Sequence, residues 1–238
     1  MNPAGRHEAR PKVTVLIPAA GMGKRMGKTV AKQFLPLGDK PMLAHTLLSF
    51  QRAPDVDEII PILSQEDMES CLRDIIERYR ITKVKTLVAG GRERQDSVAN
   101  GLKKIGTDAG VVLVHDGVRP FVTQEMIRET VALANKGECV AVGVPVKDTI
   151  KEVDADGMVC RTLDRSRLWA IQTPQAFPVK TLKRAYEASF THKLPGTDDA
   201  TLVERAGISV RVIMGSYENI KITTPEDLIL AEEILKGK

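Results

Sequence analysis

Short apolar runs and longer amphipathic segments alternate along most of the chain. The apolar runs are rich in β-branched residues and have strand length, whereas the segments between them have helical spacing. We predict strands over residues 13–17, 58–63, 84–88, 111–114, 139–144, 210–214 and 219–223. We predict helices over residues 41–51, 65–79, 97–105, 124–134, 178–189, 197–206 and 225–235. This alternation is typical of βαβ units and predicts an α/β fold with a mostly parallel sheet.

The alternation is interrupted between residues 146 and 168. Two strand-like segments, 149–153 and 158–163, flank the turn signal at 154–157, which ends in a glycine. A hairpin inserted in a parallel domain cannot bury both of its faces alone. We therefore expect a β-arm at about 146–168 that packs on a second copy of the chain; folding back on its own domain is the alternative. The rest of residues 13–238 is expected to form one domain, preceded by a disordered tail at 1–12.

A glycine-rich basic loop follows the first predicted strand. Pro18 ends that strand, because proline has no N–H for the sheet ladder. Backbone N–H groups at glycines, together with nearby cations, favour phosphate binding. Neither the P-loop pattern nor the dinucleotide-binding pattern fits, since each fails by one residue. A βα turn with solvated lysines remains the alternative. The loop contains Ala19, Ala20, Gly21, Gly23, Lys24, Arg25, Lys28 and Lys32.

Composition and charge narrow the class of protein. The chain has 238 residues, of which 42% are hydrophobic and 28% charged, as in globular domains. No apolar run approaches a membrane span, and no signal peptide is evident. Three scattered cysteines suit a reducing cytoplasm. A net charge of +4 and few aromatic residues favour a small anionic substrate over nucleic acid.

Polar side chains are predicted to gather at the carboxyl ends of the strands, where parallel α/β sheets bind ligands. Asp116 directly follows a wholly apolar strand, and we interpret it as a candidate metal ligand. An aspartate in this place also fits a P-loop hydrolase or an ordinary turn. Arg94 and Asp96 are interpreted as a local ion pair or a helix cap, and His115 as a packed residue.

Several sequence motifs occur in a fixed order along the chain. The loop A-A-G-M-G-K-R-M with the later K-Q pair is similar to that of nucleotidyltransferases with a Rossmann-like fold. The motifs that follow are G-G-R-E-R-Q-D-S-V, H-D-G-V-R-P, P-V-K-D-T, L-D-R-S-R-L-W, T-P-Q-A-F, T-D-D-A and N-I-K-I-T. In this order they resemble the motifs of the 2-C-methyl-D-erythritol 4-phosphate cytidylyltransferase family, and the resemblance runs from about Val13 to Leu235.

The resemblance implies a Rossmann-like three-layer nucleotidyltransferase fold and transfer of CMP from CTP to a polyol phosphate with Mg²⁺. It also implies a homodimer whose arm reaches the neighbouring site. The implied catalytic residues are Arg25, Lys32 and Lys221, and the implied metal ligand is Asp116. The implied nucleotide-binding residues are Ala19, Ala20, Gly21, Gly23, Gly90, Gly91 and Ser97. The implied substrate-binding residues are Arg119, Thr149, Arg165 and Lys221.

Three other functions stay open at the level of sequence. A related cytidylyltransferase that uses ribitol 5-phosphate shares much of the pattern. A P-loop nucleotide hydrolase is suggested by Gly27-Lys28-Thr29, and a non-catalytic nucleotide-binding module by the loop alone. The chain also departs from the family pattern at Ala31, Val118 and Glu218. The departure at Glu218 leaves a second carboxylate ligand for Mg²⁺ without support.

Overall fold

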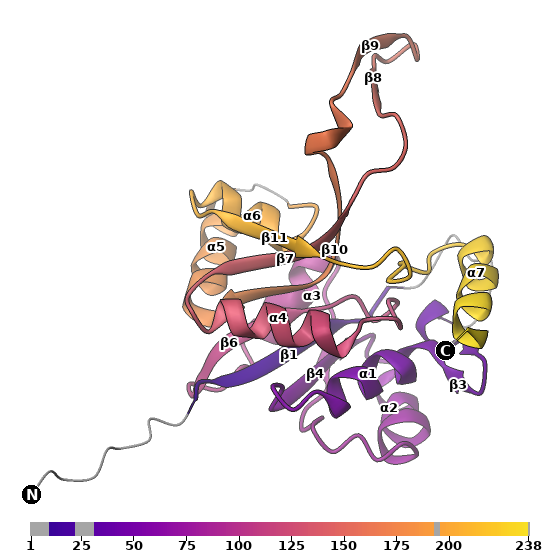
Figure 1. The fold of residues 1–238 in the computed structure, drawn as a ribbon. Coiled ribbons are helices and arrows are strands. Elements are labelled where there is room, and N and C mark those ends of the chain that lie inside the picture. Colours follow the sequence, from indigo (N-terminus) through magenta and orange to yellow (C-terminus); the bar gives the residue numbers. More distant parts are fainter. Residues whose placement is uncertain (1–9, 22–30, 193–195, 238) are drawn as a thin grey trace, which may run out of the picture.

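A central β-sheet with helices on both faces forms the body of the protein (Figure 1). The structure is a computed structural model and describes residues 10–21, 31–192 and 196–237. Within these residues the main sheet has seven strands in the order β11-β7-β10-β6-β1-β4-β5. Every neighbouring pair is parallel except those that involve β10, which runs antiparallel between β6 and β7. The strands are β1 (Lys12–Pro18), β4 (Glu58–Leu63), β5 (Val88–Ala89), β6 (Ala109–Val114), β7 (Cys139–Pro145), β10 (Trp169–Pro178) and β11 (Val210–Met214).

The helices form a layer on each face of the sheet, except the last helix, whose apolar side chains form a separate cluster with Leu37, Met42 and Phe121. They are α1 (Met42–Arg52), α2 (Met68–Cys71), α3 (Arg94–Leu102), α4 (Gln124–Ala134), α5 (Val179–His192), α6 (Asp199–Arg205) and α7 (Pro225–Lys236). A π-helical segment (Leu72–Glu77) continues α2, and 3-10 turns occur at Lys32–Phe34 and Arg165–Arg167. A small hairpin joins β2 (Pro36–Leu37) to β3 (Lys40–Pro41).

Strand β1 shows why the fold has three layers. Successive side chains of a strand point to opposite faces. Val15 and Ile17 accordingly pack with α1 and α4 on one face, whereas Leu16 packs with α3, α5 and α6 on the other. All three side chains are fully buried, and burial of each stabilises the fold by about 1.5–3 kcal/mol. The expected three-layer, mostly parallel architecture is confirmed.

Three segments differ from the sequence-based expectation. Val84 forms only an isolated bridge, so the strand predicted over 84–88 shrinks to β5. Residues 169–174, which are in none of the predicted strands or helices, belong to the antiparallel strand β10. Residues 219–223 form no strand; instead the Asn219 side chain is buried and bonds β10, while Ile222 packs beneath α7.

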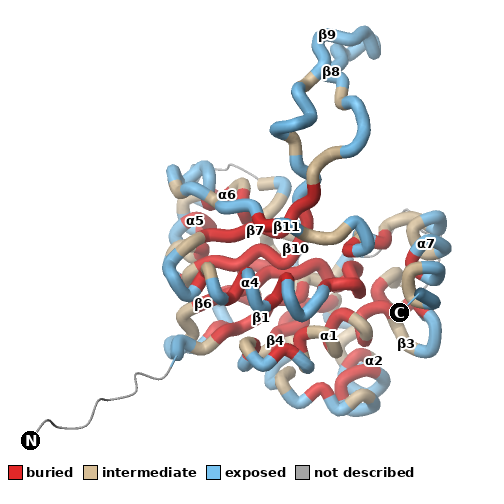
Figure 2. The backbone as a smooth tube through the Cα atoms, viewed as in Figure 1, coloured by how far each residue is buried: buried red, intermediate tan, exposed pale blue. Residues whose placement is uncertain are grey.

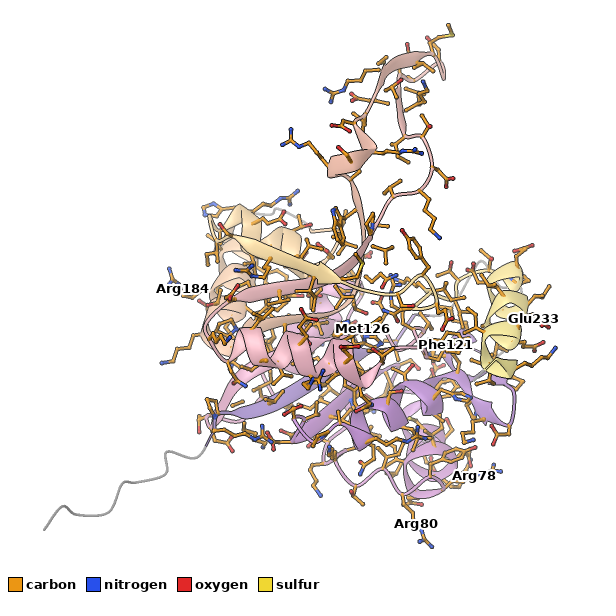
Figure 3. All side chains as sticks on the ribbon, in the orientation of Figure 1. Arg78, Arg80, Phe121, Met126, Arg184 and Glu233 are labelled. Atoms are coloured by element: carbon orange, nitrogen blue, oxygen red, sulfur yellow. The ribbon has the colours of Figure 1, made fainter. Side chains whose placement is uncertain are left out.

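The predicted hairpin is present as an arm that extends from the body of the protein (Figure 1). Strand β8 (Lys151–Val153) pairs antiparallel with β9 (Val159–Thr162), and every residue of both strands is exposed (Figure 2). Figure 3 shows the side chains of the arm standing clear of the domain. Folding back on its own domain, the alternative for this segment, is not what the structure describes.

The start of the chain is ordered earlier than expected. Lys12 begins β1, and the Arg10 guanidinium donates to the carboxylate of Asp57 at 2.8 Å. The tail predicted over 1–12 is therefore wrong for these last residues, because Arg10 finds a carboxylate partner; residues 1–9 lie outside the described residues. Among the helices that the structure describes, none has the length and apolar character needed to cross a membrane.

Candidate active site

A cavity of about 230 Å³ opens at the carboxyl ends of the central strands. Residues that follow β1, β5 and β6 form most of its wall, as expected for a parallel α/β sheet. The lining residues are Pro18, Ala19, Ala20, Gly21, Lys32, Gln33, Gly91, Arg92, Glu93, Arg94, Ser97, Asp116, Val118 and Lys221. The cavity thus brings together most of the residues that the sequence predicted for the nucleotide and the catalytic step.

The loops after β1 and β5 touch each other at Gly90. A Cβ atom at this position would lie 2.4 Å from the Cβ of Ala20, so only glycine allows the two loops to approach so closely. Next to it, the N–H of Gly91 donates to the Ser97 hydroxyl at 3.0 Å, and that hydroxyl donates to the carbonyl of Glu93 at 3.1 Å. Ser97 therefore fixes the loop at the start of α3 and keeps a backbone wall along the cavity.

Asp116 lies at the end of β6 among three cations. Its carboxylate oxygens are 3.0 Å from Lys221 Nζ, 3.4 Å from Arg119 Nε and 3.5 Å from Arg94 Nε. Burial alone would raise the pKa of Asp116, but the charges of Arg94, Lys221 and Arg119 outweigh burial and hold the pKa well below its usual value. The cavity therefore contains an ionised carboxylate at neutral pH.

His115 holds the backbone next to Asp116 in place. Its ring is fully buried, and its Nε2–H donates to the carbonyl of Arg119 at 3.0 Å. Nδ1 then accepts from the Thr173 hydroxyl at 3.0 Å, and that hydroxyl accepts the N–H of Asp116 at 3.1 Å. Burial lowers the pKa of His115 to about 4, so the ring is neutral. His115 is a packed residue, as the sequence predicted.

Arg119 and Asn219 connect the end of β6 to the segment that carries Lys221. Arg119 Nη1 donates to the carbonyl of Asn219 at 2.7 Å, and the Asn219 amide donates to the carbonyl of Thr173 at 2.9 Å. These bonds bring Lys221 to Asp116. The sequence analysis gave no role to Thr173 or Asn219, although both lie in motifs that it singled out.

Arg94 is the main correction to the site. Its Nη2 donates to Asp199 at 2.7 Å, across 105 positions of sequence, so its ion pair is not local. The same guanidinium forms ion pairs with two buried carboxylates, Asp199 and Asp116. The spacing of these residues in the sequence could not reveal this arrangement. Asp96 does cap α3, where Glu93 and Asp96 form a reciprocal capping box.

Among the described residues, four of those predicted for the site do not line this cavity: Gly90, Arg119, Thr149 and Arg165. Gly23 and Arg25 lie outside the described residues. Thr149 is exposed at the base of the arm, and Arg165 is exposed on the arm itself. Arg165 Nη1 donates to the carbonyl of Lys147 at 2.8 Å. Within a single chain, the described residues of the arm are therefore not gathered with those of the cavity.

The residues present fit a magnesium ion bound together with a nucleotide. Mg²⁺ is usually held by one or two carboxylates, water and substrate phosphates rather than by an all-protein cage. Asp116 supplies one ionised carboxylate in the cavity wall. No group of three or more acidic, histidine or cysteine side chains that could hold a metal occurs among the residues described. The donor set thus suits an ion that arrives with phosphate oxygens.

Small residues, lysines and an ionised aspartate at the carboxyl ends of the central strands of a three-layer α/β fold form a site suited to nucleotidyl transfer. The sequence model of the 2-C-methyl-D-erythritol 4-phosphate cytidylyltransferase family matches residues 13–237. The chain belongs to this family, which confirms the resemblance noted in the sequence.

Individual relatives agree along nearly the whole chain. The 2-C-methyl-D-erythritol 4-phosphate cytidylyltransferase of Syntrophotalea carbinolica is 52% identical over 94% of this chain and 96% of its own. The enzyme of the same name from Alkaliphilus metalliredigens is 50% identical over 95% of this chain and 94% of its own. The crystal structure of 4-diphosphocytidyl-2C-methyl-D-erythritol synthase from Anaerococcus prevotii has a TM-score of 0.84 at 36% identity, covering 94% of this chain and 96% of that one.

Proposed function

We propose that this chain transfers CMP from CTP to 2-C-methyl-D-erythritol 4-phosphate. The products are 4-diphosphocytidyl-2-C-methyl-D-erythritol and pyrophosphate. The observation that carries the proposal is the ionised Asp116 with Lys221 at 3.0 Å in a cavity walled by the loops after β1 and β5. Family membership supplies the substrates, and it does not favour ribitol 5-phosphate transfer or a P-loop hydrolase.

The reaction needs positioning and charge neutralisation more than covalent help from the protein. An oxygen of the substrate phosphate forms a bond to the α-phosphorus of CTP. The bond from that phosphorus to the oxygen bridging to the β-phosphorus breaks, and pyrophosphate leaves with the electron pair. The nucleophile is already an anion, so no general base is required. This agrees with the buried His115, both of whose ring nitrogens are hydrogen-bonded within the protein.

Cations and backbone groups divide the work at this site. Lys32 and Lys221 lie in the cavity wall, where they neutralise the charge that builds on the phosphates. Arg25 is proposed for the same task. The small residues Ala19, Ala20 and Gly21 let the backbone approach the triphosphate. Gly90, Gly91 and Ser97 shape the wall that is proposed to receive the cytosine.

Asp116 would hold Mg²⁺ together with phosphate oxygens. When bound, the ion would neutralise charge on the triphosphate and on the departing pyrophosphate. Lys221 forms an ion pair with Asp116. If the ion bound to this carboxylate, the Lys221 ammonium could contact a phosphate instead. Glu218, for which sequence gave no support as a second ligand, is left out of this proposal.

The arm is proposed to complete the site of a second copy of the chain in a homodimer. Val153, Met158 and Val159 expose 52%, 68% and 57% of their surface, although they are apolar. A two-stranded hairpin is only marginally stable by itself in water, so these side chains call for a partner. Thr149 and Arg165 would then reach the polyol phosphate in the partner's cavity, next to Arg119. We place this enzyme in the cytoplasm.

Pyrophosphate release tests the proposal directly. The chain is incubated with CTP and Mg²⁺, with either 2-C-methyl-D-erythritol 4-phosphate or ribitol 5-phosphate as acceptor. Release with the first acceptor alone is expected. Release with ribitol 5-phosphate alone would support cytidylyl transfer but change the assigned acceptor. No pyrophosphate release with either acceptor would refute the function.

A further inference from the structure

Asp199 joins three helices behind the wall of the cavity. It lies at the start of α6 and is fully buried. One of its carboxylate oxygens accepts from Arg94 Nη2, on α3, at 2.7 Å, and the other accepts the hydroxyl of Tyr186, on α5. Arg94 itself lines the cavity, so Asp199 is one residue removed from any bound nucleotide.

The start of α6 is fixed on the central sheet. Asp198 caps the helix by accepting the N–H of Thr201 at 2.9 Å. Gln175, from β10, donates to Asp198 at 2.6 Å and accepts the N–H of Ala200 at 2.9 Å. Asp199 lies between these two anchored residues. Its carboxylate therefore has a fixed place from which to hold Arg94.

Arg94 has a choice between two carboxylates. A guanidinium pairs best with a carboxylate through two parallel N–H bonds. Asp199 takes one nitrogen at 2.7 Å, while the distance from Nε to Asp116 stays at 3.5 Å. Without Asp199, the Arg94 guanidinium would be able to turn towards Asp116 Oδ1, because Lys221 and Arg119 contact the other oxygen, Oδ2. That contact would occupy one oxygen of the carboxylate that is proposed to hold Mg²⁺, and it would fix the guanidinium on Asp116 instead of leaving it to meet phosphate oxygens.

We propose that Asp199, held by Tyr186, is a positioning residue for cytidylyl transfer: it keeps the Arg94 guanidinium facing the triphosphate and away from a closer contact with Asp116. The proposal rests on the function proposed above and adds to it a residue that does not touch the substrates. Arg94 thereby joins Lys32 and Lys221 in neutralising the nucleotide.

The test measures CTP affinity, by calorimetry without acceptor, in Asp199→Asn and Tyr186→Phe. Asp199→Asn keeps the shape of the side chain and removes its charge. We expect CTP to bind about 10- to 100-fold more weakly, as for other residues that orient a ligand-binding group. Tyr186→Phe should weaken binding in the same direction but less. The Michaelis constant for the polyol phosphate should stay within about twofold of wild type in both variants.

A control variant tests whether the loss of an arginine–carboxylate pair far from the cavity also weakens CTP binding. Asp57→Asn also removes a carboxylate that pairs with an arginine, Arg10, but it lies at the start of β4, at the opposite edge of the sheet. This variant should bind CTP as the wild type does, although it loses an ion pair of similar length. Weaker CTP binding in Asp57→Asn would mean that general loosening explains the loss.

A double-mutant cycle decides whether Asp199 acts through Arg94. In an Arg94→Gln background, Asp199→Asn should change CTP affinity by less than about twofold, because the group that it positions is gone. The proposal is overturned if the loss is as large in that background, or if Asp199→Asn binds CTP normally. If Asp199→Asn does not fold, Tyr186→Phe completes the same cycle. A wild-type chain that binds CTP without releasing pyrophosphate would refute only the function.

Discussion

Lys221 and Arg119 both contact Asp116, yet we expect removal of Lys221 to lower mainly activity and removal of Arg119 to lower mainly stability. The two ion pairs have similar lengths, 3.0 and 3.4 Å. The side chain of Lys221 is 42% exposed, whereas that of Arg119 is 11% exposed. Replacing each by methionine keeps the apolar stem and removes the charge. The perturbations Lys221→Met and Arg119→Met therefore compare a solvent-facing cation with a buried one on the same carboxylate.

The expected stability effects follow from what each change leaves unpaired. Lys221→Met leaves Asp116 with Arg94 and Arg119, and a partly exposed ion pair contributes only about 0–1 kcal/mol. Arg119→Met removes a buried charge from Asp116 and also the donor that serves the carbonyl of Asn219. Breaking one partner of a buried pair costs about 3–5 kcal/mol. Arg119→Met should therefore be the strongly destabilising change.

Activity should rank the two variants the other way at temperatures where both are folded. Lys221→Met should lose about 10²- to 10³-fold in kcat, the range for removing one group that stabilises transition-state charge. Urea unfolding without nucleotide gives the stabilities, and pyrophosphate release gives kcat. The reasoning would be refuted if Lys221→Met lowered the free energy of unfolding by more than about 2 kcal/mol relative to wild type, or if its kcat equalled that of wild type.

Three further outcomes follow from the structure. Gly90→Ala would place a Cβ 2.4 Å from that of Ala20, so we expect about 1–3 kcal/mol of destabilisation in urea and slower turnover; wild-type values would show that the loops can separate. The pKa of His115 is near 6.5 in the unfolded chain and about 4 in the folded protein. The free energy of unfolding should therefore be highest above pH 6.5 and fall by about 1.4 kcal/mol per pH unit between pH 6.5 and pH 4. His115→Gln should flatten that fall in urea titrations, and an unchanged slope would contradict it. If the chain forms the proposed homodimer, Val159→Asp on the exposed arm should dissociate it in sedimentation, whereas a variant that remains a dimer would exclude the arm from the interface.

Local patterns were enough to predict most elements of the fold. The helix after Thr123 begins where its cap predicts, and the last helix starts at Pro225 with a Thr224–Asp227 capping box. The antiparallel strand β10 could not be foreseen in the same way. Its direction depends on pairing with β6 and β7, which lie far away in sequence, and a short apolar run has no preference for either direction.

The site divides along the same line. Residues at strand ends, such as Asp116 and Gly91, were predictable because parallel strands bring their carboxyl ends to one edge. Contacts that span the chain were not. Arg94 finds Asp199 and Arg119 finds Asn219 only after α6 and the segment beyond β11 have packed. Buried polar groups need partners, but sequence does not say which ones.

The three cations around Asp116 differ in how firmly they are held, and this difference suggests how the site accepts a triphosphate. Arg94 has a second, buried partner in Asp199, and Arg119 has one in the carbonyl of Asn219. Lys221 is the most exposed of the three and reaches Asp116 from a flexible stem. Because a partly exposed ion pair is weak, Lys221 can exchange the carboxylate for a phosphate at the lowest cost. The arginines then keep Asp116 ionised and in place while the nucleotide and its metal enter.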